Sequence, residues 1–245
     1  AFEQPAVRAI LVYPMNALIN SQEAALEAYV RNYERAHGAS PVRFAKYTGE
    51  TPLAERHAIW ENPPDILLTN FMMLELLLVR EQDRRLVDAM RGNLQFLVLD
   101  EIHTYRGRQG ADVAMLARRV RLAAANDGLI AIGTSATLIS EGSRDERRDA
   151  AARVASRLFG IPFDRDQVID ETLQRITTVP VPTSRDALRA AVEAPLPPKG
   201  DVEAFRQHPL AAWVEAHFGV TEDAEGRLVR HQPVSVREAA AALAR

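Results

Sequence analysis

Short apolar runs alternate with helical patterns over the first two thirds of the chain. The clearest runs lie at residues 9–13, 65–69, 94–99 and 129–133. Residues 42–47 alternate apolar and polar side chains, as a half-buried strand does. Between the runs, apolar residues recur three or four positions apart, which is the spacing of amphipathic helices. Continuous apolar runs separated by helices are typical of buried parallel strands, so the pattern predicts an α/β domain with a mostly parallel sheet and helices on both faces.

Residues with capping chemistry mark where two of these helices begin. Asn16 precedes a helical pattern that Gly38 ends, and Asn16 is expected to cap that helix. Ser143 and Glu146 have the spacing of a capping box, in front of a charged helical pattern that reaches Phe159. The first of these helices closely follows an apolar run, as in units that alternate strand and helix.

The character of the chain changes after residue 177. The prolines of this region are Pro180, Pro182, Pro195, Pro197 and Pro198. One short helical segment lies between them, a helix around Trp213 comes next, and Ser235 with Glu238 gives a capping box for the last helix. We therefore expect residues 1–177 to form the α/β domain, and residues 178–245 to form a proline-rich linker and a mainly helical extension.

The composition is that of an ordinary globular protein, with 47% hydrophobic and 26% charged residues among 245. The net charge of −3 gives no general attraction to nucleic acid, so any phosphate contact must be local. The absence of cysteine excludes disulfides, thiolate metal sites and cysteine nucleophiles. No apolar run approaches the roughly 18 residues that span a bilayer, and the start lacks a signal-peptide pattern. We expect a soluble, cytoplasmic protein without a membrane partner.

Two adjacent acids close the apolar run that ends at Leu99. Open α/β sheets bind their ligands at the carboxyl ends of their strands, so Asp100 and Glu101 are expected at a site. Paired carboxylates suit nucleotide chemistry, because one can hold Mg²⁺ through water while the other orients the attacking water. Asp100 is the candidate for the metal side and Glu101 for the water side.

Four further segments are informative because of the order in which they follow one another along the chain. They are residues 13–22 (Tyr-Pro-Met-Asn-Ala-Leu-Ile-Asn-Ser-Gln), Thr69-Asn70, residues 100–103 (Asp-Glu-Ile-His) and residues 134–137 (Thr-Ser-Ala-Thr). They resemble motifs Ia, Ib, II and III of superfamily 2 helicases of the DEAD/DEAH-box type. The His-Thr-Tyr-Arg-Gly string at 103–107 also resembles a DNA-helicase branch of that superfamily. The resemblance covers roughly the first two thirds of the chain and implies a RecA-like P-loop NTPase lobe, a three-layer sandwich.

The resemblance also implies cofactors and catalytic residues. It implies that ATP and Mg²⁺ are the cofactors, with Asp100 on the metal and Glu101 on the hydrolytic water. His103, together with Ser135 and Thr137, would couple the nucleotide site to strand movement. From the residues alone, a lone histidine at a strand end is more often a hydrogen-bonded structural residue. Hydroxyl side chains at a strand end are equally ordinary, and only the pairing with residues 100–103 favours the functional interpretation.

Several residues are candidates to contact a nucleic-acid backbone. Pro14, Asn16 and Ala17 occupy the positions of motif Ia, although a plain strand–turn–helix with a capping asparagine explains them too. Gly49 lies in a turn where many helicases contact the bound strand, and a simple turn between strand and helix explains it equally well.

Thr69 and Asn70 suit a sugar-phosphate backbone and also suit an N-cap, and both roles are compatible. Arg106 and Arg108 lie in a loop that leaves the same sheet edge as the acids. Single-stranded DNA is favoured over RNA as the partner, because of the resemblance at residues 103–107.

The sequence also looks like part of a longer protein. The only lysines are Lys46 and Lys199, and neither follows a glycine, so a Gly-x-x-x-x-Gly-Lys phosphate loop does not occur in these 245 residues. The chain begins without methionine and ends within a helical pattern. We expect the phosphate loop and the second motor lobe to lie elsewhere in the parent chain, and the fragment alone not to hydrolyse ATP.

Two other classes of function remain open from the sequence. The chain could be a non-catalytic nucleic-acid- or protein-binding module built on a decayed motor lobe. It could also be a metal-dependent hydrolase that uses Asp100, Glu101 and His103 as ligands, although no further ligands cluster around them in the sequence.

Overall fold

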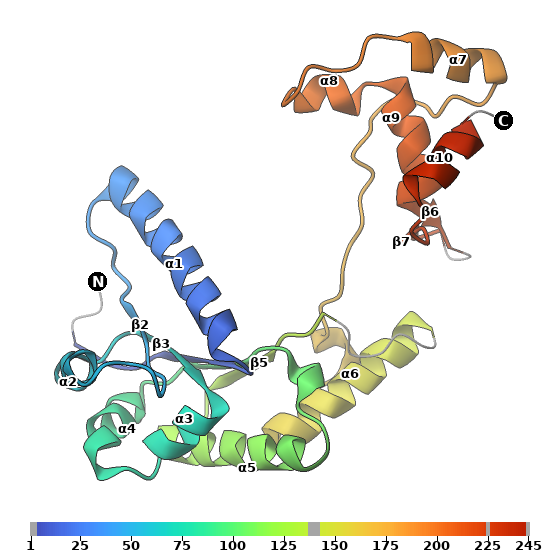
Figure 1. The fold of residues 1–245 in the computed structure, drawn as a ribbon. Coiled ribbons are helices and arrows are strands. Elements are labelled where there is room, and N and C mark those ends of the chain that lie inside the picture. The colour runs from blue at the N-terminus through green and yellow to red at the C-terminus, as the bar shows by residue number, and fades with distance from the viewer. Residues whose placement is uncertain (1–3, 137–142, 224–225, 244–245) are drawn as a thin grey trace. The chain divides into compact units, whose positions relative to one another are not determined.

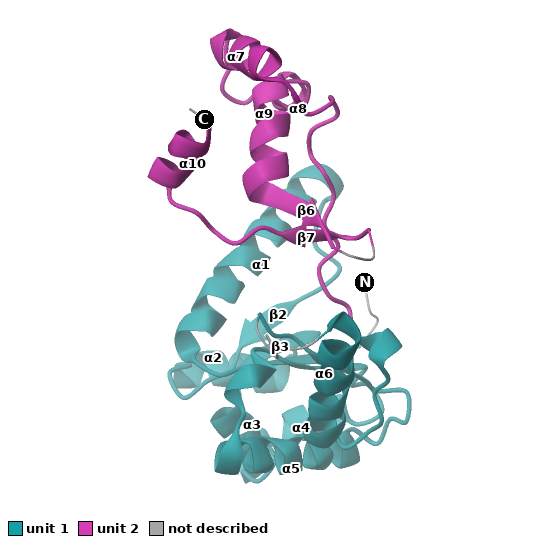
Figure 2. Ribbon diagram, turned by 90° about the vertical axis from the view of Figure 1, so that its right-hand side faces the viewer, with its two compact units in different colours: residues 1–168 teal, residues 169–245 magenta. Residues whose placement is uncertain are grey.

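The computed structural model describes residues 4–136, 143–223 and 226–243. The chain forms two compact units, residues 1–168 and residues 169–245, coloured separately in Figure 2. The change of composition after residue 177 lies inside the second unit. No helix among the described residues is long and apolar enough to cross a membrane.

The first unit is built on a five-stranded sheet with the order β2-β3-β1-β4-β5. Its strands are β1 (Ala9–Tyr13), β2 (Phe44–Lys46), β3 (Ile66–Asn70), β4 (Phe96–Leu99) and β5 (Ile130–Gly133). Every neighbouring pair is parallel. Because the strands are parallel, their carboxyl ends meet at one edge of the sheet. The expected α/β class, with the parallel sheet of a RecA-like lobe, is confirmed.

Helices cover both faces of this sheet (Figure 1). The helices are α1 (Asn16–His37), α2 (Leu53–Glu61), α3 (Phe71–Leu77), α4 (Arg84–Met90), α5 (Gly107–Ala124) and α6 (Arg144–Phe159), with short turns η1 (Glu81–Asp83), η2 (Ile102–Thr104) and η3 (Arg165–Gln167). On one face, Ile19 of α1 packs with Tyr13 and Leu68 in a small core. On the other face, α2 to α6 enclose a larger core around Val12 and Leu97. These two cores make the three layers that the resemblance implied.

The face covered by α1 is only half enclosed in the described residues. Phe96, Ile130 and Ile132 share this face by strand register, and they are 37%, 52% and 39% exposed. β5 also lies at an edge of the sheet as described. Exposed apolar side chains beside an unpaired strand edge are typical of a surface that another element can cover.

Local differences from the expected elements have simple causes. The strand expected at 42–47 is shorter, Phe44–Lys46, and the helix expected after Asn70 ends at Leu77. α4 was not expected. It is seven residues long and buries only Leu86 and Met90, so its sequence is too short to display the helical repeat of apolar residues.

The prediction that Asn16 caps α1 was wrong. The N-cap is Met15, which makes no side-chain cap, and the amide of Asn16 makes other bonds. Asn70 does cap α3, and Ser143 with Glu146 forms the expected capping box of α6.

The second unit is mainly helical. Its elements are α7 (Arg185–Glu193), α8 (Val202–Arg206), α9 (Pro209–Val214), the π-helical turn η4 (Glu215–Gly219), β6 (Val220–Glu222), β7 (Leu228–Arg230) and α10 (Val236–Leu243). The antiparallel hairpin of β6 and β7 was not expected. Glu215 ties the extended segment before α7 to η4, because its carboxylate accepts bonds from the backbone N–H groups of Ile176 and Thr177 at 2.6 and 3.1 Å.

Candidate functional site

The candidate site lies at the carboxyl edge of the sheet in the first unit. Asp100 follows β4 there, and its backbone N–H donates to the carbonyl of Val12 in β1 at 2.9 Å. The Thr134 hydroxyl donates to the Asp100 carboxylate from the end of β5. Leu99 pairs with Gly133, so the next residue of each strand, Asp100 and Thr134, must lie side by side.

Thr134 is a site residue that the sequence interpretation passed over, because it singled out Ser135 and Thr137 of the same segment. The register of two neighbouring parallel strands is the signal that finds it. Thr137 lies outside the described residues.

Glu101 begins a tight turn immediately after Asp100. Its backbone has φ 51° and ψ 49°, in the left-handed region that residues with a Cβ rarely adopt. The turn buries Ile102, whose N–H donates to the carbonyl of Thr134 at 2.9 Å, and directs the flanking side chains of Glu101 and His103 to the partly exposed side.

Glu101, His103 and Ser135 meet on that side of the turn. His103 Nδ1 lies 2.9 Å from the Ser135 hydroxyl oxygen and 3.0 Å from Glu101 Oε2. The contact with Glu101 lacks hydrogen-bond alignment, and Glu101 Oε2 is buried without a hydrogen-bond partner among the described residues. Glu101 and Ser135, from the segments that resemble motifs II and III, therefore touch through the histidine.

Two tyrosines surround the Asp100 carboxylate with neutral groups. Burial raises the pKa of Tyr13 and of Tyr105, and the negative charge of Asp100 adds to the rise in both. Both phenols therefore stay protonated at neutral pH. The Tyr105 hydroxyl is buried without a hydrogen-bond partner among the described residues.

The donors at this edge fit Mg²⁺ better than zinc. Asp100, Glu101 and Thr134 supply only oxygen, which is the ligand type that Mg²⁺ prefers. Glu101 Oε2, a buried oxygen without an aligned donor, fits the same chemistry. Nowhere in the described ranges do three or more His, Cys, Asp or Glu side chains gather as a metal cluster. A magnesium ion here would therefore keep much of its water shell and be held by one or two carboxylates and a phosphate.

A second polar group links three loops at the same edge. Asn70 Nδ2 donates to Asn16 Oδ1 at 2.8 Å, and Asn16 Nδ2 donates to Glu50 Oε1 at 2.9 Å. Asn70 Oδ1 accepts from the N–H of Met73 at 2.8 Å. The structure thus brings together two of the residues singled out from motifs Ia and Ib, and adds Glu50, which the sequence interpretation did not single out.

The other candidate residues occupy different surroundings. Gly49 and Ala17 are exposed, Pro14 is half-buried, and Thr69 is buried with its hydroxyl donating to the Tyr47 carbonyl at 2.7 Å. The buried Thr69 hydroxyl therefore stabilises the start of the loop after β2, through its bond to the Tyr47 carbonyl.

Arg106 and Arg108 are exposed, and Arg106 Nε donates to the carbonyl of His103 at 2.8 Å. The loop expected to hold both arginines is shorter than the sequence indicated, because α5 begins at Gly107 and Arg108 lies in its first turn. Gly110, also in that turn, is required because a Cβ there would lie 2.6 Å from the Tyr105 carbonyl oxygen.

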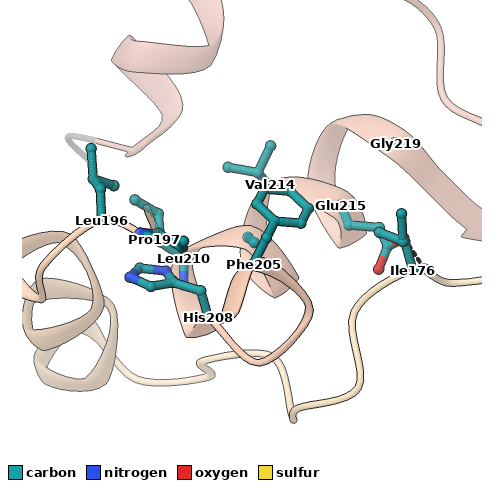
Figure 3. A pocket seen from close by; sticks show the side chains of 10 residues that line it. Ile176, Leu196, Pro197, Phe205, His208, Leu210, Val214, Glu215 and Gly219 are labelled. Atoms are coloured by element: carbon teal, nitrogen blue, oxygen red, sulfur yellow. Dashed lines mark hydrogen bonds between the residues drawn. The ribbon is translucent and has the colours of Figure 1, made fainter. Parts of the chain in front are cut away.

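The second unit carries an apolar pocket of about 380 Å³ (Figure 3). Its lining comprises Ile176, Leu196, Pro197, Phe205, His208, Leu210, Ala211, Val214, Glu215 and Gly219. Glu215 is the only acid there, and its carboxylate is already bonded to Ile176 and Thr177. Both ring nitrogens of His208 are engaged as well, because Nδ1 accepts from the N–H of Leu210 and Nε2 lies 3.2 Å from the Pro195 carbonyl oxygen, so the pocket offers mainly apolar volume.

The all-parallel five-stranded sheet with helices on both faces defines the class of protein: an α/β domain with the fold of a RecA-like lobe. A sequence model of the DEAD/DEAH box helicase family matches residues 1–144, and the chain belongs to that family.

Known proteins agree with this assignment. Druantia protein DruE of Escherichia coli (strain UMEA 4076-1) is 28% identical, over 57% of this chain and 13% of DruE. The uncharacterized ATP-dependent helicase MJ1574 of Methanocaldococcus jannaschii is 31% identical, over 55% of this chain and 19% of its own length. The solved DUF1998 helicase MrfA has the same fold, with a TM-score of 0.53 at 24% identity over 76% of this chain and 27% of MrfA. This chain matches less than a fifth of the length of the two curated relatives.

Proposed function

We propose that residues 1–245 contribute the first motor lobe of an ATP-dependent helicase or translocase that acts on nucleic acid. The observation that supports this best is the contact of Glu101 and Ser135 through His103, at the sheet edge that also carries the Asn16–Asn70 bond. The group proposed to respond to the nucleotide and the group proposed to contact the nucleic-acid backbone then lie at the same edge of one rigid sheet. Such an arrangement suits an enzyme that couples hydrolysis to movement along a strand.

At the nucleotide side, Asp100 holds Mg²⁺ through water and Glu101 positions the hydrolytic water. The ion supplies charge neutralisation to the phosphates when it is bound. Thr134 fixes the Asp100 carboxylate, and His103 responds to changes at Glu101 and passes them to Ser135 and Thr137.

At the nucleic-acid side, neutral donors grip the backbone without reading bases. Asn16 and Asn70 supply these donors, and the exposed Ala17 and Gly49 allow the strand to approach them. Pro14 has no N–H and shapes the turn before α1, and Thr69, predicted to contact the backbone, is buried and supports the interface from within instead. Arg106 and Arg108 add the positive charge. Single-stranded DNA is favoured over RNA because residues 103–107 resemble a DNA-helicase branch.

The phosphate cradle and the second lobe would come from outside residues 1–245, within the same parent chain. The open edge of β5 and the exposed Phe96, Ile130 and Ile132 are suited to receive a further strand and helix. Phosphoryl transfer depends on positioned phosphates, so residues 1–245 alone are expected not to turn over ATP.

The test is the ATPase rate of the complete parent protein with single-stranded DNA or single-stranded RNA added in parallel. One polymer is expected to stimulate the rate, and Glu101→Gln is expected to lower it by about 100-fold or more, because the water loses its base. Glu193→Gln, on the exposed side of α7, is the matched control and should leave the rate unchanged. An unstimulated rate that Glu101→Gln does not alter would overturn the motor and favour a binding module.

A further inference from the structure

Glu50 stands at the end of a hydrogen-bond chain that crosses three loops of the first unit. The chain runs from the backbone N–H of Met73 to Asn70, from Asn70 to Asn16, and from Asn16 to Glu50. Its three bonds are 2.8, 2.8 and 2.9 Å long, within the normal range for N–H···O bonds. Loops after β1, β2 and β3 are thereby joined in one polar group.

Both ends of this chain have a fixed direction. A backbone N–H can only donate, so Asn70 must turn its oxygen to Met73 and its NH₂ group to Asn16. An ionised carboxylate can only accept, so Asn16 must turn its NH₂ group to Glu50. The two asparagine amides, which could each flip if isolated, therefore have one orientation.

The loop that carries Glu50 is held firmly by the residues around it. The Arg56 guanidinium donates to the carbonyls of Thr51, Thr48 and Gly49 at 2.9, 2.8 and 3.1 Å. The Thr51 hydroxyl donates to Lys46 and accepts from the N–H of Thr48. These bonds fix the conformation of the loop, and Glu50 lies at its exposed tip.

The loop is also anchored in the core. Tyr47 precedes it, is fully buried, and donates its hydroxyl to the buried Asp83. The indole N–H of Trp60 lies 3.0 Å from the Tyr47 hydroxyl oxygen and 3.1 Å from Asp83 Oδ1. Glu50 is thus presented to Asn16 by a rigid support.

We propose that Glu50 is a positioning residue of the nucleic-acid interface, which acts through Asn16. An amide NH₂ group has two hydrogens, and the chain uses one from Asn16 and one from Asn70. With both amides locked in one orientation, the second hydrogens are presented together to a phosphodiester of a single strand. This inference rests on the proposed function, since it assumes that Asn16 and Asn70 contact the backbone.

The test is a double-mutant cycle in the 245-residue chain, with Asn16→Ala, Glu50→Ala and the double variant. Binding of a fluorescein-labelled oligo-deoxythymidylate of about 12 nucleotides is followed by anisotropy. Each single variant is expected to weaken binding about 3- to 10-fold, since each removes the benefit of about one oriented hydrogen bond. The double variant is expected to match Asn16→Ala, because Glu50 has no effect when Asn16 is absent.

Matched controls separate this role from plain charge and from stability. Glu55→Ala removes an exposed acid of α2 close to the same loop, and it should bind slightly more tightly or unchanged. Thermal unfolding reports whether Glu50→Ala leaves the fold intact. If Glu50→Ala disrupts the fold, the binding measurements use Glu50→Gln, whose side chain has the same size.

Three outcomes overturn the inference. They are tighter binding by Glu50→Ala, a further loss when Glu50→Ala is added to Asn16→Ala, and equal effects of Glu50→Ala and Glu55→Ala. Wild-type chain that binds neither DNA nor RNA would instead overturn the proposed nucleic-acid interface itself.

Discussion

Glu101 is the most strained residue of the candidate site. A left-handed backbone conformation costs a residue with a Cβ roughly 1–2 kcal/mol, and Glu101 adopts it directly after Asp100. Strained residues of this kind persist where the surrounding structure holds them, and they concentrate at functional sites. Here the bond from Ile102 to Thr134 and the burial of Ile102 hold the turn. The strain directs the Glu101 side chain to His103 instead of into the sheet.

Glu101→Gly is therefore expected to stabilise the protein. Glycine adopts the left-handed region freely, and the partly exposed Glu101 side chain contributes little packing, so the free energy of unfolding should rise by about 0.5–1 kcal/mol. Urea unfolding of the 245-residue chain measures this.

Glu101→Gln is the control for this prediction, because it removes the carboxylate beside His103 and keeps the left-handed backbone strain. It should not stabilise the chain. Equal or lower stability of Glu101→Gly would mean that the turn is not strained. In the complete parent protein, the same glycine variant should lose ATPase activity, since it has no group to hold the water.

At the scale of elements, apolar runs identified the strands and their order along the chain, because parallel strands are buried on both faces. The runs ending at Leu99 and Gly133 also placed the acids and hydroxyls at one edge. Contacts that depend on strand register or on three loops meeting, such as Thr134 with Asp100 and Asn16 with Glu50, have no local sequence signal. That is why Asn16 was expected to cap its own helix, the role that short polar residues have most often at such a position.

The ionised carboxylate of Glu215 contributes to the stability of the second unit. Partial burial alone would raise the pKa of Glu215, but hydrogen bonds from the Thr177 hydroxyl and from the N–H groups of Ile176 and Thr177 outweigh it and lower the pKa below its ordinary value of 4.5. A lowered folded-state pKa means that the unfolded chain binds the proton more tightly. The stability from Glu215 is therefore complete above that ordinary value, and it is lost as the pH falls through the folded-state pKa.

Acidification below pH 4.5 is thus expected to loosen the second unit, and Glu215→Gln is expected to weaken it already at pH 7 and to flatten the response. A Trp60→Phe background leaves Trp213 as the only tryptophan, so its fluorescence reports on this unit. Urea midpoints are then compared between pH 3 and pH 7, which lie on either side of the ordinary carboxyl pKa of 4.5. Equal pH dependence with and without Glu215 would show that another acid of this unit, such as Glu238, carries the effect.

At the scale of the whole molecule, a net charge of −3 sets how the chain can bind a polyanion. Long-range attraction is absent, so affinity must come from local contacts. In the proposed interface, most contacts are neutral amides and backbone groups, which release no counterions from a strand. Only Arg106 and Arg108 would neutralise phosphates there, and both are exposed, Arg106 immediately before α5 and Arg108 in its first turn.

Binding to a single strand is consequently expected to depend weakly on salt. Each neutralised phosphate contributes a slope of about −0.7 to a plot of log affinity against log salt, so two arginines give about −1.4. Arg106→Gln and Arg108→Gln should each reduce the slope by about 0.7, whereas Asn16→Ala should lower affinity at an unchanged slope. Anisotropy titrations of the 245-residue chain at several salt concentrations measure both. A slope several times steeper that survives loss of both arginines would place the phosphate contacts on another surface of the chain.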